Sequence, residues 1–230
     1  MLKELINNFL EFIAPSIVLL VLLILRKRWK GTGFMKILFF YYLCSSINLG
    51  IATYLAFINA PSNIFWYNVH GFLSALMLSL FFRQILQSAC SKKLVLALSA
   101  LGLAAYIIIL LFFDDRITFN STGYSIISLL IVLYSFLFLR EMFRLLNTDP
   151  IHTEVTVWIV SAFLTYYLSS FLIQLSYKNL TRFLATAFSQ KERDSWVWAI
   201  HNVLYLLANI IIAINIIRFS RISKNRQKQF

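Results

Sequence analysis

The stretch that decides the fold is Leu94–Phe113, which reads LVLALSALGLAAYIIILLFF and contains no charged residue. An α-helix of this length is about 30 Å long, which matches the hydrocarbon thickness of a lipid bilayer. Lys92 and Lys93 come directly before the stretch, and Asp114 and Asp115 come directly after it. An uncharged apolar run with charged residues at both ends is typical of a transmembrane helix.

Six other apolar runs have the same character, so the sequence predicts an all-α, polytopic bundle of seven transmembrane helices. The predicted helices cover residues 9–25, 37–58, 64–86, 94–113, 123–139, 155–177 and 196–217. The connections between them are too short to hold a soluble catalytic or DNA-binding domain. We therefore expect residues 1–230 to form a single transmembrane domain that ends in a basic cytoplasmic tail, residues 218–230.

The composition also indicates that lipid surrounds most of the chain. Sixty per cent of the residues are hydrophobic and only 13% are charged, whereas soluble domains are about 25% charged. The 21 Lys and Arg outnumber the 9 Asp and Glu, but these cations lie between the apolar runs, as the flanks of membrane helices do. We expect the lipid bilayer as a partner and no nucleic acid.

The distribution of Lys and Arg predicts the orientation of the bundle. With the N-terminus outside, fifteen of these cations fall on the inner side and six on the outer side. The inner cations are Arg26, Lys27, Arg28, Lys30, Lys36, Arg83, Lys92, Lys93, Arg140, Arg144, Arg218, Arg221, Lys224, Arg226 and Lys228. Cytoplasmic loops of membrane proteins carry an excess of Lys and Arg. We therefore expect an N-out, C-in protein of the bacterial inner membrane.

Polar side chains at membrane depth are the candidates for a functional site, because burying them in lipid is costly. The candidates for a ligand-binding pocket are Glu11, Asn48, Tyr67, His70, His201 and Asn202. His70 and His201 lie at about equal depth below the predicted outer ends of their helices, and Glu11 is slightly shallower. These side chains therefore form one predicted layer near the outer surface.

Three interpretations of this layer remain open. The layer can line a pocket for a small ligand. His70 and His201 can instead bind a haem between them, or a metal ion together with Glu11. In the third interpretation each histidine only bonds a neighbouring helix, for example His201 with Asn48 or Tyr67. Because the sequence has no H-x-x-x-H or H-E-x-x-H spacing, our leading expectation includes no cofactor and no metal.

Charged residues at the predicted inner helix ends have two alternative roles. Arg83, Arg140 and Arg144 can extend to the phosphates of lipid headgroups. Alternatively, Arg140 and Arg144 form a docking surface for a separate protein partner, such as a signalling kinase or a subunit of a membrane complex. The sequence has no Gly-rich phosphate loop and no G-x-S-x-G motif, so we name no catalytic residue and do not expect an enzyme.

The last two predicted helices carry the most specific sequence features. Residues 157–159 read VWI, 162–170 read AFLTYYLSS, 198–204 read WAIHNVL, and Asn209 follows. These segments resemble a largely uncharacterised group of small multi-pass membrane proteins of Bacteroidota, in which a W-x-I-H-N run opens the last helix. The resemblance implies a sensor-like protein that acts beside a separate histidine kinase. It also implies that Trp198, His201, Asn202 and Asn209 are shared features of the group.

The leading functional hypothesis is a sensory or signalling membrane subunit, receptor-like, that binds a ligand from the outer side or from the bilayer. Its cytoplasmic mass is too small to carry an output, so it would act through a separate partner. The first alternative is a haem- or metal-binding redox protein that uses His70 and His201. The second alternative is a transporter or a non-catalytic subunit of a larger membrane complex.

Overall fold

The computed structural model describes residues 2–29, 32–58, 60, 62–112, 120–144, 150–183 and 190–227. Side chains are described for residues 9–29, 32–58, 60, 62–112, 120–144, 155–176 and 197–222. Within these ranges the regular secondary structure is entirely α-helical. The helices are α1 (Leu2–Ile24), α2 (Arg26–Trp29), α3 (Gly33–Phe57), α4 (Ile64–Ile85), α5 (Ala89–Phe112), α6 (Ser121–Arg144), α7 (Pro150–Phe183) and α8 (Gln190–Gln227).

Six of these helices, α3 to α8, are long and apolar enough to cross a membrane, which fits an integral multi-pass membrane protein. The apolar part of α1 whose side chains are described, Phe9–Ile24, is shorter than the other six. Several helices extend beyond the predicted runs, and α8 continues to Gln227 through residues that we expected to form a tail. Hydropathy marks the edge of the hydrocarbon layer, whereas backbone hydrogen bonding continues into the polar boundary as long as the residues favour a helix.

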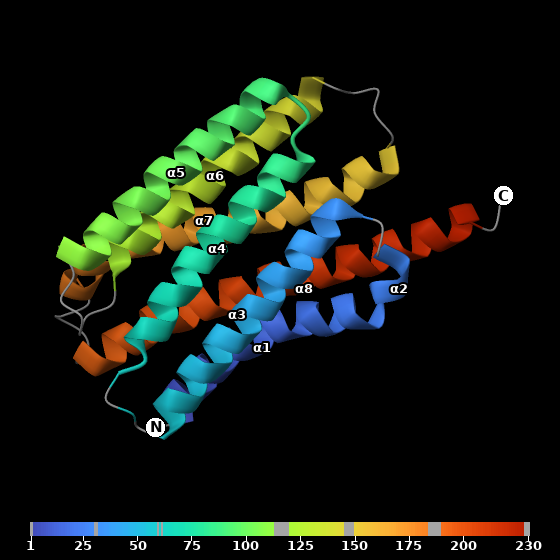
Figure 1. Cartoon of the computed structure of the whole chain (residues 1–230). Coiled ribbons are helices and arrows are strands. Elements are labelled where there is room, and N and C mark those ends of the chain that lie inside the picture. Colours follow the sequence, from blue (N-terminus) through green and yellow to red (C-terminus); the bar gives the residue numbers. More distant parts are fainter. Residues whose placement is uncertain are drawn as a thin grey trace.

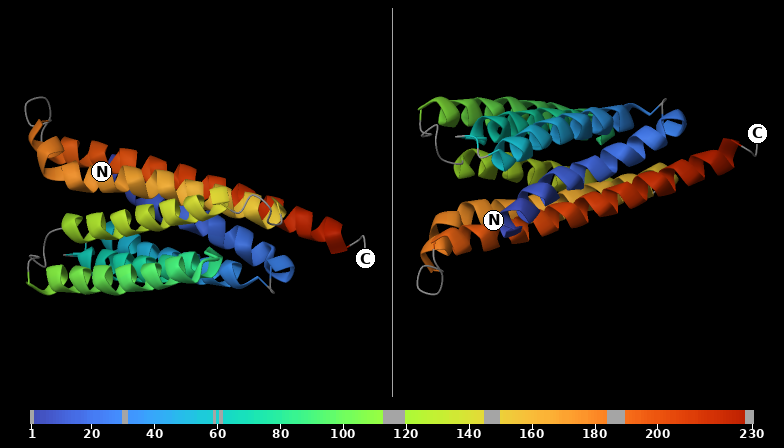
Figure 2. Two further views of the ribbon diagram at one scale, coloured as in Figure 1. Left: turned by 90° about the horizontal axis from the view of Figure 1, so that it is seen from above. Right: turned by 90° about the horizontal axis from the view of Figure 1, so that it is seen from below.

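The long helices form a closed ring in the order of the sequence. Each of α3 to α7 packs against the helix that follows it, and α8 packs against α1, which in turn packs against α3 (Figure 1). In the views from above and below, α7 and α8 lie on one side of the bundle and α3, α4 and α5 on the other, with α1 and α6 between them (Figure 2). This ring gives each long helix an inward face.

The main hydrophobic core lies at one end of the ring, which we call the packed half. It is built from the C-terminal part of α1 with α2, the N-terminal part of α3, the C-terminal parts of α4 and α6, and the facing parts of α7 and α8. Its members include Leu22, Trp29, Leu38, Phe81, Phe82, Tyr134, Phe138, Ile159, Phe163, Ile212 and Phe219.

Aromatic rings join several helices in the packed half. The Phe81 ring has edge-to-face contacts with Phe34 and Phe163, at centroid distances of 6.3 and 5.8 Å. Phe34 also contacts Phe219, at 6.1 Å. Such pairs add about 0.5–1.5 kcal/mol each beyond the burial of their surface. Four helices, α3, α4, α7 and α8, are therefore joined by one aromatic cluster.

Candidate functional site

The opposite end of the ring, which we call the polar half, contains a carboxyl group shared by three helices. The Tyr67 hydroxyl on α4 donates a hydrogen bond to Glu11 Oε2 on α1, at 2.6 Å. The Asn202 side chain on α8 also hydrogen bonds to this carboxyl group. Three of the residues selected from the sequence therefore meet, and we call them the Glu11 cluster. Hydrogen bonds to a carboxyl group offset part of the cost of placing it inside a membrane protein.

A proline interrupts the backbone hydrogen bonding of α1 beside this carboxyl group. Pro15 lies inside α1, and because proline has no N–H group the backbone carbonyl of Glu11 loses its usual helical donor. One residue further along, the Ser16 hydroxyl donates to the Phe12 carbonyl at 2.7 Å. Prolines within transmembrane helices are tolerated where neighbouring helices and hydroxyl groups satisfy the freed backbone groups.

Two tyrosines attach α5 and α6 to the same level of α4. The Tyr124 hydroxyl donates to the Tyr67 carbonyl, and the Tyr106 hydroxyl donates to the Asn68 carbonyl at 3.0 Å. Gly71 makes room for both rings, because a Cβ atom at this position would lie 2.9 Å from the Tyr106 hydroxyl and 3.1 Å from Tyr124 Cζ. The position of Tyr67, which holds Glu11, is therefore linked to both helices.

His201 belongs to a neighbouring aromatic group on α7 and α8. Its Nε2 atom lies 3.1 Å from the Tyr166 hydroxyl, and its ring contacts Trp198 at a centroid distance of 5.5 Å. The Tyr166 ring also contacts Tyr205, at 4.8 Å. The partner of His201 is thus Tyr166, and not Asn48 or Tyr67 as we suggested from the sequence. His201 Nδ1 is buried and makes no hydrogen bond with the residues that the structure describes.

His70 and Asn48 bond within their own helices. His70 Nε2 lies 3.5 Å from the Ser74 hydroxyl on α4, and the Asn48 amide donates to the Cys44 carbonyl on α3 at 2.8 Å. Among the described residues, no group of three His, Cys, Asp or Glu side chains is placed to hold a metal ion. The structure therefore does not gather Glu11, His70 and His201 into a three-ligand metal group.

An apolar groove between α4 and α5 lies next to the Glu11 cluster. It encloses about 660 Å³, which falls within the roughly 300–1,000 Å³ of ordinary small-molecule sites. It is lined by Ser62, Ile64, Phe65, Asn68, Val69, Phe72, Leu73, Tyr106, Ile107, Leu110 and Leu111. Asn68 follows Tyr67 in α4, so a molecule in this groove would contact the residue adjacent to the one that holds Glu11.

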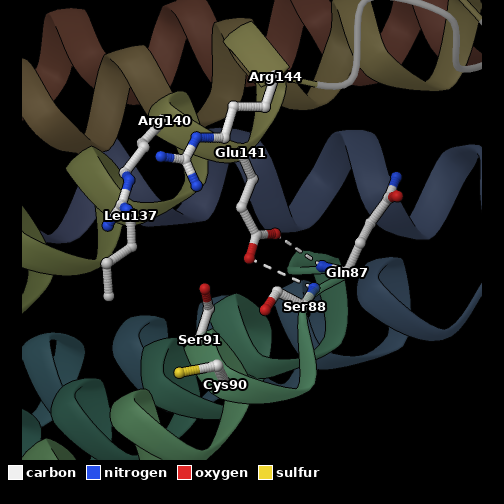
Figure 3. Close-up of a pocket in the computed structure, with 8 residues that line it drawn as sticks. All are labelled: Gln87, Ser88, Cys90, Ser91, Leu137, Arg140, Glu141 and Arg144. Atoms are coloured by element: carbon white, nitrogen blue, oxygen red, sulfur yellow. Dashed lines mark hydrogen bonds between the residues drawn. The ribbon is translucent and has the colours of Figure 1, made fainter.

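A second cavity, of about 510 Å³, lies at the other end of the bundle, between the α4–α5 connection and the end of α6. We call it the arginine pocket. It is lined by Gln87, Ser88, Cys90, Ser91, Leu137, Arg140, Glu141 and Arg144 (Figure 3). Both arginines that we proposed from the sequence as docking residues line this pocket.

Sequence reasoning missed the tyrosines and the proline of this site. Tyr106, Tyr124 and Tyr166 lie in apolar runs, where a tyrosine is usually assigned to packing or to the membrane interface. Pro15 was visible as a helix-breaking residue in the middle of an apolar run, four positions after Glu11. That spacing could have drawn attention to the carbonyl that it frees.

The polar half combines a carboxyl group, two imidazoles and several phenols that can donate and accept hydrogen bonds, and the neighbouring groove offers Ser62, Asn68 and Tyr106 among apolar side chains. No protein-family model, curated protein or solved structure matches the chain.

Proposed function

We propose that this chain is a seven-helix sensory membrane protein that binds an amphiphilic ligand from the bilayer and signals through a separate protein. The observation that carries the proposal is that Asn68, which lines the α4–α5 groove, directly follows Tyr67 in α4. Tyr67 bonds Glu11, and the same carboxyl group bonds Asn202 on the longest described helix, α8. The proposal agrees with the sensor-like character that the resemblance to Bacteroidota membrane proteins implies.

In this proposal α1 is the seventh transmembrane span. It has 23 residues, enough for about 34 Å of helix, and it packs between α3 and α8 as a member of the ring. The positions of Lys and Arg favour an N-terminus outside and a C-terminus in the cytoplasm, in a bacterial inner membrane. The groove and the Glu11 cluster then lie toward the outer side, and the arginine pocket lies toward the cytoplasm.

The groove is suited to a molecule with an apolar chain and a small polar end. Its walls are formed mostly by Ile, Leu, Val and Phe side chains, and its polar residues are Ser62, Asn68 and Tyr106. Phe65 and Leu111, on its two walls, are each 66% exposed at the bundle surface. A ligand could therefore enter from the hydrocarbon layer. A single-chain fatty acid has the required chemistry.

Helix α8 provides the output. It has 38 residues, which is about 57 Å of helix and longer than the roughly 30 Å hydrocarbon layer. Its C-terminal end projects beyond the other helices (Figures 1 and 2). A ligand that binds one arrangement of the Glu11 cluster more tightly than another would shift α8 between two positions. The projecting end would present that shift to the partner.

A photoreactive analogue of palmitic acid, added to the protein in phosphatidylcholine nanodiscs, tests the ligand site. We expect cross-links on α4 and α5 and a several-fold loss of them in Val69→Trp, which fills the groove. Leu80→Trp is the matched control, because Leu80 is 39% exposed on the same helix and does not line the groove. Equal cross-linking in both variants, or cross-links spread over all helices, would contradict the proposed site.

A distance measurement tests the signal. Spin labels at Arg221→Cys on α8 and Lys93→Cys on α5, with Cys44 and Cys90 replaced by Ala, should change their separation when palmitic acid is added. The change should disappear in Tyr67→Phe, which breaks the connection to Glu11, and remain in Tyr54→Phe, whose side chain is exposed. If palmitic acid binds but the distance never changes, the groove is a lipid site without a sensory role.

Fusions after Phe230 test the orientation. A reporter that is active only in the cytoplasm should work at this position, and one that is active only outside should be silent. The reverse result would place the groove on the cytoplasmic side and overturn the proposed arrangement of input and output.

A further inference from the structure

The arginine pocket contains two cations that have no partner within the described protein. Arg140 and Arg144 are four residues apart in α6, so both side chains lie on the same side of the helix. Both are exposed. Neither guanidinium makes an ion pair or a hydrogen bond with any residue that the structure describes, including the nearby Glu141. The positive charge of the pocket is therefore available to a ligand.

Glu141 lines the same pocket, but its carboxylate bonds the backbone of the α4–α5 connection instead of pairing with these arginines. The Gln87 N–H donates to Glu141 Oε2 at 2.8 Å, and the Ser88 N–H donates to Oε1 at 3.3 Å (Figure 3). These two bonds join α6 to the connection that precedes α5. They also fix the wall of the pocket that faces the arginines.

The opposite wall offers hydrogen-bond donors to an anion. Ser91 and Cys90, in the first turn of α5, lie across the space from Arg140 and Arg144 (Figure 3). The N-terminus of α5 adds a partial positive charge to the donors on this wall. A phosphate group between the two walls would contact the guanidinium groups on one side and the Ser88 and Ser91 hydroxyls on the other.

Apolar residues beside the pocket indicate what carries the phosphate. Phe143, between the two arginines in α6, is 75% exposed, and Phe136 is 54% exposed. Leu137 lines the pocket itself. Exposed aromatic side chains at this level place the pocket at the boundary between hydrocarbon and headgroups, where basic pockets between transmembrane helices bind anionic lipids. An acyl chain could extend along these apolar side chains while the phosphate occupies the pocket.

We propose that the arginine pocket binds the phosphate headgroup of an anionic phospholipid, with Arg140 and Arg144 as its cationic ligands. This site is separate from the α4–α5 groove and does not depend on the sensory role. The pocket volume of about 510 Å³ leaves space around a single phosphate for the glycerol of a headgroup. Lipid bound here would join α6 to the N-terminal end of α5.

Cys90 makes the site directly measurable, because it is exposed and lines the pocket. In a Cys44→Ala background, the rate at which a maleimide modifies Cys90 would be compared in nanodiscs of phosphatidylcholine alone and of phosphatidylcholine with phosphatidylglycerol. We expect phosphatidylglycerol to slow the modification. Each cation near an anionic membrane surface contributes about 1 kcal/mol, so Arg140→Gln with Arg144→Gln should weaken this protection by roughly 30-fold.

Arg83→Gln is the matched control. Arg83 is an exposed cation in the last turn of α4, at the same end of the bundle as the pocket, and it does not line the pocket. The variant should leave the protection within about two-fold of the unmodified protein, in line with the weak effect of an isolated surface charge. Equal loss in Arg83→Gln and in the double variant would show general surface attraction and overturn the proposal.

Two further additions, made in nanodiscs of phosphatidylcholine alone, separate the possible sources of the anion. Inorganic phosphate should not protect Cys90, because it lacks the acyl chain; full protection by it would show a site for free phosphate. A soluble acidic peptide should also fail to protect. Protection by the peptide but not by phosphatidylglycerol would make this pocket a protein-docking site and overturn the lipid assignment.

Discussion

The two halves of the bundle are built on the same helices but from different side chains. In the packed half, Phe81 and Phe82 of α4 are fully buried among other aromatic rings. In the polar half of the same helix, Tyr67 and His70 are only partly buried and make hydrogen bonds. Among the side chains described inside the ring, the carboxyl group of Glu11 and both imidazoles, of His70 and His201, lie in the polar half.

The difference shows how one bundle can combine rigidity with adaptability. Close-packed aromatic side chains have few alternative arrangements, because moving one ring opens a cavity beside its neighbours. Hydrogen-bonded side chains beside a groove can exchange partners at lower cost. The packed half is therefore expected to hold the helices in place while the polar half responds to a ligand. Each of the following predictions tests this contrast, from the largest effect to the smallest.

Truncating a single buried side chain of the packed half should have the largest effect on stability. Phe81→Ala is expected to lower the free energy of unfolding by about 3–5 kcal/mol, because it removes a fully buried ring and leaves a cavity. Phe136→Ala, on the exposed side of α6, should cost far less. Unfolding in mixed micelles of increasing denaturing detergent would measure both. Similar losses for the two variants would show that the packed half is not the rigid part of the fold.

Adding a side chain at Gly71 should lower stability by an intermediate amount. Gly71→Val adds a Cβ atom close to the Tyr106 hydroxyl and the Tyr124 ring, so both tyrosines have to move from their bonds to α4. We expect a loss of about 1–3 kcal/mol, as for other overpacked sites. Ala100→Val, at an exposed position of α5, provides the control. If Gly71→Val costs no more than the control, the tyrosines do not hold α4 in position.

Removing a single hydrogen bond from the Glu11 cluster should have a smaller effect. Tyr67→Phe, and Glu11→Met, which removes the oxygen acceptor at similar side-chain length, are each expected to cost about 0.6 to 1.7 kcal/mol, the range for hydrogen bonds between membrane helices. The double variant should cost less than the sum of the two single variants, because each one breaks the same bond. Fully additive losses would mean that the Tyr67–Glu11 bond contributes nothing measurable.

The smallest effect is expected for the absorption spectrum and metal content, which test the haem- or metal-binding alternative. The purified protein should show no intense visible absorption band and no stoichiometric metal, and His70→Ala and His201→Ala should leave the spectrum unchanged. The physical reason is that the two imidazoles bond to different partners, Ser74 and Tyr166. A band that is present in the unmodified protein and vanishes in both variants would instead support a haem between them.

Some features of this protein follow from its sequence alone. Uncharged runs such as Leu94–Phe113 predicted the positions of the long helices, because the cost of placing a charge in lipid leaves a clear signal at each helix end. The polar character of the layer that contains Glu11 and Tyr67 was also visible in the sequence. The length of α8 was not, since its last turns consist of polar residues that hydropathy assigns to a tail.

The tertiary structure decided which polar side chains meet. A shift of two residues in a predicted helix boundary moves a side chain by about 3 Å along the helix axis and rotates it by roughly 200° around it. Sequence reasoning therefore could not distinguish Tyr166 from Asn48 as the partner of His201, or place Asn202 beside Glu11. The same uncertainty hid both cavities, because a groove depends on how two helices approach each other. The sequence determined where the long apolar helices lie, and only their packing determined which partners their polar side chains have.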